Sequence, residues 1–166
     1  MFSVDSYLNS IKANLDRQTD LLVGNLKNIF TSTFSSKIDL LDFSAFIEPT
    51  RFELTIRLFS MDKEANEVFY EGDDSMVFAG SKEVLAEVEY FHLNDRRVDD
   101  FFEFYEQYEE TLNPLEQKVF TDWFHQCWEK ASGDVLKLPA YFVFHDDVKS
   151  YDLKTNLWID DDEKWS

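Results

Sequence analysis

The segment RFELTIRL, residues 51–58, decides the fold class of this chain because apolar and polar side chains alternate along it. The polar positions are charged or carry a hydroxyl, so the apolar side chains share one face of a strand: Phe52, Leu54, Ile56 and Leu58. A period of two is typical of a strand that is half-buried in an antiparallel sheet. We therefore predict a sheet with one packed face and one face towards solvent.

More strands are predicted on both sides of this segment. They cover residues 38–47, 67–70, 76–79 and 84–90. Gly80 and Ser81 have the composition of a two-residue hairpin turn, which would join the last two of these strands. On the last strand, the alternation places four side chains on the packed face: Val84, Ala86, Val88 and Tyr90. The middle of the chain is thus predicted to be an antiparallel meander of about five strands.

Helical periodicity precedes and follows the meander. Apolar residues recur at steps of three and four over residues 4–34, which predicts one long N-terminal helix or two collinear helices, with Gly24 as the weak point. A second apolar face follows over residues 98–112. Asn113, Pro114 and Glu116 then match the cap, the first helical position and the capping-box acid of a new helix. We therefore predict two helices after the meander.

The last part of the chain returns to strand. Residues 139–145 are apolar on both faces, which is typical of a central strand. Residues 151–159 are predicted as a final strand, and residues 160–165 as a solvated tail. Segregated helices and strands with no linker or repeat indicate one α+β domain over residues 1–166, with a mostly antiparallel sheet.

Charge and aromatic content together restrict the class of protein. The chain has 34 acidic against 16 basic residues, for a net charge of −18, yet it also has 17 Phe, 7 Tyr and 4 Trp. Acidic disordered tails are poor in aromatic residues, so we expect the acid on the outside of a packed domain. Such a surface repels nucleic acid and anionic lipid, and it attracts basic proteins. A basic protein is therefore the expected partner.

The expected compartment is the cytoplasm. The N-terminus lacks the basic and apolar pattern of a signal peptide, and no window of the sequence is apolar for long enough to span a membrane. Because the chain has a single cysteine, Cys127, it cannot form an internal disulfide. The sequence leaves the oligomeric state open.

No motif predicts catalysis, a metal site or a cofactor. Cys127 and His125 are two apart on a predicted helix, so they point in different directions. His145 with Asp146 and Asp147 lacks the spacing of a metal site. We therefore predict a protein that is not an enzyme. Two alternatives remain: an enzyme with a pocket around His145, Asp146 and Asp152, or an adaptor that assembles through the amphipathic N-terminal helix.

The acidic residues gather in places that could dock a basic partner. Over residues 98–112 they recur at steps of four, three and four and form one stripe on a helix: Asp99, Glu103, Glu106 and Glu110. Two further clusters are predicted to join it: Asp73 with Asp74, and Asp160 with Asp161 and Asp162. Trp158 is the expected aromatic anchor, with Trp165 and Phe59 as further candidates.

The final third of the chain combines an aromatic helix with an aromatic strand. Its residues are Trp123, Phe124, Cys127, Trp128, Pro139, Tyr141, Phe142, His145, Asp146, Asp147, Tyr151, Asp152, Leu153 and Trp158. In this ending, and in its small size and acidity, the chain resembles the immunity proteins of bacterial polymorphic-toxin and contact-dependent inhibition systems. That resemblance implies stoichiometric occlusion of a cognate toxin, commonly a basic nuclease. It carries over no binding residues, because such families differ in fold and binding surface.

Overall fold

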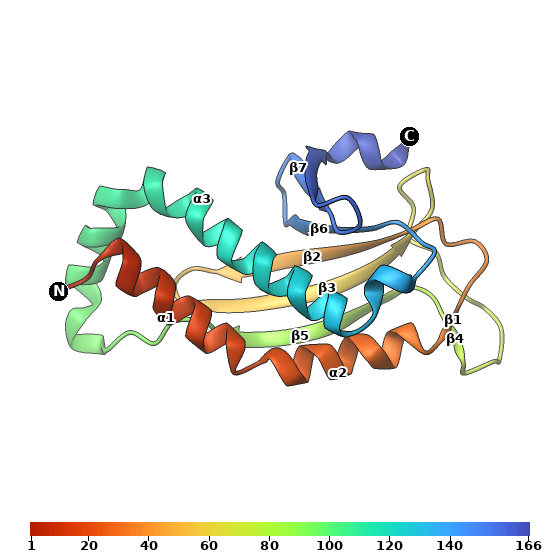
Figure 1. The fold of residues 1–166 in the computed structure, drawn as a ribbon, viewed down its shortest axis with the longest axis horizontal. Coiled ribbons are helices and arrows are strands. Elements are labelled where there is room, and N and C mark those ends of the chain that lie inside the picture. The colour runs from red at the N-terminus through yellow and green to blue at the C-terminus, as the bar shows by residue number, and fades with distance from the viewer.

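The computed structural model describes residues 1–166 and has an α+β fold (Figure 1). Its α-helices are α1 (Val4–Asp16), α2 (Thr19–Phe30) and α3 (Val98–Lys130). The strands are β1 (Thr33–Phe34), β2 (Leu40–Glu48), β3 (Glu53–Met61), β4 (Val77–Phe78), β5 (Ser81–Glu89), β6 (Ala140–Phe144), β7 (Lys149–Asp152) and β8 (Leu157–Asp160). Short 3₁₀ helices are η1 (Asp95–Arg97), η2 (Gly133–Val135) and η3 (Asp161–Trp165).

Six strands form the main sheet, in the order β5-β3-β2-β6-β7-β8. Four of its five strand pairs are antiparallel, and the pair of β2 with β6 is parallel. The alternation predicted over residues 51–58 is confirmed, because burial alternates along β3. The central strand predicted at 139–145 is confirmed as β6, where every residue is buried. A strand covered on both faces needs apolar side chains at every position, which is why its sequence does not alternate.

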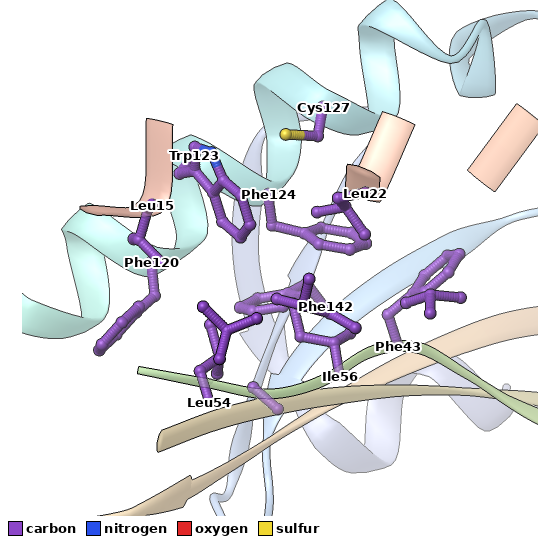
Figure 2. Packing of buried hydrophobic residues seen from close by; sticks show 14 of the residues in the cluster. Leu15, Leu22, Phe43, Leu54, Ile56, Phe120, Trp123, Phe124, Cys127 and Phe142 are labelled. Carbon is purple, nitrogen blue, oxygen red and sulfur yellow. The ribbon is translucent and has the colours of Figure 1, made fainter. Parts of the chain in front are cut away.

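The three α-helices cover one face of the sheet, and the core lies between them and the strands (Figures 1 and 2). Phe124 of α3 stacks on Phe142 of β6 with ring centroids 4.6 Å apart, and it lies 5.0 Å from the Phe43 ring of β2. Leu15 of α1 and Leu22 of α2 are fully buried against the same cluster. Each such side chain contributes roughly 1.5–3 kcal/mol through burial. The aromatic residues of this acidic chain thus account for its packed interior.

The opposite face of the sheet is partly covered by the C-terminal segment. Asp42 lies between Leu41 and Phe43, which pack under the helices, so its side chain points to this other face. There it meets Lys164 of η3, which is buried. The prediction of a solvated tail at 160–165 is therefore only partly correct. Asp160, Asp162 and Glu163 are exposed, but buried Lys164 anchors the tail to a strand 122 positions away.

The predicted final strand at 151–159 is also wrong, because it is a hairpin of β7 and β8. Asn156, with φ of 61°, adopts the left-handed conformation in the turn between them. The Asp152 carboxylate accepts a hydrogen bond from the Lys154 backbone N–H at 2.9 Å and so stabilises this turn.

The meander differs from the prediction at three places. Residues 67–70 form no strand beyond a single bridge of Glu67 to Met61. β4 pairs in parallel with β1, so the predicted hairpin at Gly80 and Ser81 does not form. Its glycine, with φ of 80°, instead donates its backbone N–H to the carbonyl of Val68.

The third difference is a β-bulge in β5. The register between β3 and β5 shifts there, and Glu87 has φ of 46°. A bulge adds one residue to one strand, so the alternation changes face. Leu85 is therefore buried, and Ala86, predicted on the packed face, is exposed.

The helices also depart from the prediction, because tertiary packing overrides local signals. The N-terminal segment is two helices that separate at Arg17 and Gln18, and Gly24 lies within α2. Conversely, residues 98–130 are one helix that continues through Pro114, so the predicted cap at Asn113 and the division into two helices are wrong. Figure 1 shows α3 changing direction near its middle. A proline removes the backbone hydrogen bond to the residue four positions earlier and bends a helix.

Candidate functional site

The first half of α3 carries the acidic stripe, defined as Asp99, Glu103, Glu106 and Glu110. All four side chains are exposed, and none makes an ion pair within the molecule. The other side of this half-helix is buried through Phe101, Phe104 and Leu112. The predicted placement of the stripe away from the aromatic face is thus what the structure shows, and its carboxylates are free to meet another molecule.

Exposed aromatic side chains also lie on this half of α3. Phe102 is 43% exposed beside the stripe, whereas Tyr108, 40% exposed, packs on Phe104 on the aromatic side of the helix. Beside Tyr108, a hollow of about 480 Å³ is lined by Phe2, Asp100, Glu103 and Phe104, among others. Arg97 closes one side of it by stacking on the Phe2 ring at 4.2 Å. Two carboxylates beside aromatic rings suit a lysine or arginine side chain of another protein.

The other predicted docking acids do not join this surface. Asp73 and Asp74 lie in the exposed loop before β4, at the end of the long axis opposite the first half of α3 (Figure 1). Trp158 is 44% exposed on the edge strand β8, where its ring packs on Tyr151. Asp162 is exposed on η3. The ten residues predicted to bind a partner therefore occupy three separate regions rather than one.

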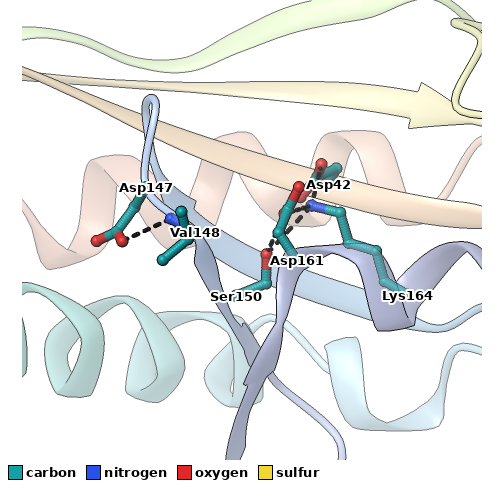
Figure 3. Close-up of polar contacts among 6 residues, drawn as sticks. All are labelled: Asp42, Asp147, Val148, Ser150, Asp161 and Lys164. Carbon is teal, nitrogen blue, oxygen red and sulfur yellow. Dashed lines mark hydrogen bonds and ion pairs between the residues drawn. The ribbon is translucent and has the colours of Figure 1, made fainter.

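The C-terminal acids are largely engaged inside the molecule. Asp160 pairs with Lys149. The Lys164 ammonium, 2% exposed, lies 2.8 Å from Asp42 Oδ2, 2.5 Å from Asp161 Oδ1 and 3.2 Å from Ser150 Oγ (Figure 3). Three acceptors around one buried cation make this a structural cluster. Asp161 and Asp160 thus secure η3 and β8 to the sheet.

The pKa values of the two carboxylates in this cluster move in opposite directions. Burial raises the pKa of Asp42, and the attraction of Lys164 offsets only part of this rise. Burial also acts to raise the pKa of Asp161, but hydrogen bonds from Lys164 and Ser150 outweigh it and hold that pKa below its usual range. Asp42 is the deeper of the two and keeps one oxygen, Oδ1, without a hydrogen-bond partner.

Sequence reasoning missed the role of Glu116. The Tyr7 hydroxyl donates to Glu116 Oε2 at 2.9 Å, and the Tyr105 hydroxyl donates to Oε1 at 2.6 Å. Burial raises the pKa of this carboxyl, and the two hydroxyls partly offset the rise. A helix that continues through Pro114 places Glu116 one turn from Leu112 and one turn from Phe120, on the apolar face. The spacing of Glu116 from Leu112 and Phe120 was the sequence signal that could have placed it on the apolar face. We did not use that signal because Glu116 was interpreted as a capping-box acid.

Glu116 lines a cavity of about 440 Å³ between α3 and the ends of β2 and β6. Five of its twelve lining residues are Phe or Tyr: Phe46, Tyr90, Tyr105, Phe120 and Phe144. The Tyr90 and Phe120 rings are 5.1 Å apart, and Phe120 lies 6.3 Å from Phe144, so the wall is continuous. His145 stacks on Phe46 at the rim, where it is more than half exposed.

The pocket predicted around His145, Asp146 and Asp152 forms only in part: a hollow of about 470 Å³ is lined by His145 and Asp146, but Asp152 is not part of it. His145 Nε2 lies 3.3 Å from Asp146 Oδ2, and both side chains are exposed. Asp152 is paired with Tyr141 in the sheet, four residues before His145, and is therefore about 13 Å away along the strand. Hence these three side chains do not converge on one substrate.

The other candidate groups also lie apart. Burial raises the pKa of the Cys127 thiol to about 11, and His125 contacts the Leu153 carbonyl and Glu129 instead. No group of three or more His, Cys, Asp or Glu side chains is arranged to hold a metal ion. The apolar face of the N-terminal helices, predicted as a possible assembly surface, is buried in the core through Tyr7, Ile11, Leu15, Leu22 and Leu26.

Comparisons with protein-family models, with curated proteins and with solved structures each returned no match. None of the helices has the length and apolar character that crossing a membrane requires.

Proposed function

We propose that this chain is a non-catalytic, acidic protein-binding module that neutralises a basic protein by stoichiometric occlusion. The observation that carries the proposal is the first half of α3, where four unpaired carboxylates lie beside exposed Phe102 and next to a hollow lined by Glu103 and Tyr108. In the cell, the role is that of an immunity protein or antitoxin in the cytoplasm, with a basic toxin such as a nuclease as the partner. The net charge of −18 supports this choice of partner.

The two kinds of side chain on this surface contribute differently to binding. Exposed carboxylates attract a cationic protein over a distance and raise the rate of association more than they tighten the complex. Aromatic side chains that become buried supply most of the affinity. Asp99 to Glu110 extends for about 17 Å along the helix axis, a length that suits part of a standard protein interface.

The test is affinity capture with the purified chain from a lysate of its source organism at low salt. We expect one basic protein in a one-to-one complex that is weakened by added salt, since exposed charges are screened. The matched baits are two variants that each carry four substitutions and have the same net charge. One neutralises the stripe (Asp99→Asn, Glu103→Gln, Glu106→Gln, Glu110→Gln), and the other neutralises distant exposed acids (Asp16→Asn, Asp20→Asn, Glu64→Gln, Glu87→Gln).

Only the stripe variant is expected to lose the partner. Equal capture by the two variants would show that net charge alone attracts the protein. Capture of no stoichiometric partner by any bait would contradict the proposed function.

A further inference from the structure

Glu116 is a buried carboxylate whose surroundings contain no cation. Its residue is 8% exposed, and its two hydrogen-bond donors are neutral phenols. No lysine or arginine lines the cavity beside it; the titratable groups there are Glu116, Tyr90, Tyr105 and His145. The other deeply buried carboxylate, Asp42, is paired with Lys164. Buried charges in proteins are normally paired, so the unpaired one requires an explanation.

The cavity has the size and the walls of a small-molecule site. Its volume of about 440 Å³ lies within the usual range for ligand pockets, roughly 300–1,000 Å³. Aromatic faces attract a cation directly, and a carboxylate in a poorly solvated site attracts it more strongly. The Tyr90 hydroxyl, which makes no hydrogen bond to the protein, and the Asn113 amide add polar groups that can orient a ligand.

From this arrangement we propose that the cavity binds a small organic cation, an ammonium group on an aromatic or other apolar body. The ammonium group lies against Glu116 and Tyr90. The apolar body lies along Phe120 and Phe144 and leaves the cavity at the rim beside Ile47 and His145. This site is distinct from the acidic stripe, so it extends the function proposed above and does not depend on it.

The experiment is an amide NMR titration of the full chain with three matched probes: phenethylamine, phenethyl alcohol and phenylacetate. We expect saturable shifts from phenethylamine at residues 45–47, 90, 113, 115–117 and 144–145. Phenethyl alcohol should bind at least about tenfold more weakly, because it lacks the charge that Glu116 attracts. Phenylacetate should not bind.

Two variants test the site itself. Glu116→Gln keeps the shape and should lower phenethylamine affinity at least about tenfold while leaving phenethyl alcohol unaffected. Glu64→Gln, which removes the same charge from an exposed acid outside the cavity and outside the stripe, is the control. If Glu116→Gln fails to fold, Ile47→Trp narrows the rim without touching the hydrogen bonds of Glu116 and should abolish binding.

Three results would overturn the inference. They are the absence of saturable shifts with phenethylamine, equal affinity for the amine and the alcohol, and unchanged binding by the folded Glu116→Gln or Ile47→Trp variant.

Discussion

Two acidic regions of similar composition serve different purposes in this molecule. The stripe on α3 has four exposed carboxylates and no internal cation to neutralise them. The C-terminal segment 160–163 contributes Asp160 to Lys149 and Asp161 to Lys164, and so fixes the end of the chain on the sheet. The difference shows that an acidic run indicates a binding surface only where its charges are not already used by the fold.

Glu116 is a third case, since it is buried like the acids around Lys164 and unpaired like the stripe. Its phenol partners satisfy its hydrogen bonds without neutralising its charge. Stability measurements can therefore separate the three kinds of carboxylate.

Lys164→Ala should destabilise the protein most, by about 3–5 kcal/mol, because it leaves Asp42 buried without its cation. The free energy of unfolding in urea measures this loss. Lys37→Ala, an exposed lysine without an ion pair, should stay within about 0.5 kcal/mol of the natural chain. Adding Asp42→Asn to Lys164→Ala should restore part of the loss. A Lys164→Ala variant as stable as Lys37→Ala would contradict the structural role of the C-terminal segment.

Glu116→Gln should change how stability depends on pH. The folded pKa of Glu116 is raised, so its favourable contribution is present at low pH and is lost as pH rises through that pKa. The free energy of unfolding of Glu116→Gln, relative to the natural chain, should therefore increase as the pH rises above the ordinary glutamate pKa of about 4.3. Urea titrations at several pH values measure this difference in free energy of unfolding. A difference that does not change with pH would exclude an unpaired buried carboxylate.

Asp161→Asn should show the opposite dependence on pH. The folded pKa of Asp161 is lowered, so its contribution is present above its ordinary pKa and is lost as pH falls through the folded value. The variant should be less stable than the natural chain at neutral pH, and the deficit should shrink below about pH 4. A deficit that stays constant down to acid pH would mean that packing, not charge, fixes this residue.

Neutralising the whole stripe should have the smallest effect on stability, within about 0.5 kcal/mol. Removing like charges at helical spacing gains a few tenths of a kcal/mol, and losing Asp99 from the first turn of α3 costs a similar amount. Thermal and urea unfolding of the fourfold variant check this. A large loss would show that the stripe is part of the fold and would remove it as a binding surface.

The parts of the fold that sequence could predict are those with a local cause. The alternation along β3 and the continuous apolar run of β6 follow from burial on one face or on two. The path of α3 through Pro114 was unpredictable from local signals, because Asn113, Pro114 and Glu116 match a helix start, and only distant contacts such as Tyr7 override it. The burial of Lys164 likewise depends on its ion pair with Asp42, a contact that arises only in the three-dimensional fold.

The same reasoning applies to the functional surfaces. The stripe was predictable because helical spacing alone places Asp99, Glu103, Glu106 and Glu110 on one side. Two facts depend on tertiary structure and were not predictable. The stripe lies far from Asp73 and Asp74, and Asp161 is paired with Lys164.

The most direct test of the central claim is the association rate constant with the captured basic partner at low salt. We compare the natural chain, the stripe variant and the equally charged control variant. We expect the stripe variant to associate at least about tenfold more slowly, while the control stays close to the natural chain. Equal slowing of both variants, or of neither, would contradict the claim that the first half of α3 is the binding surface.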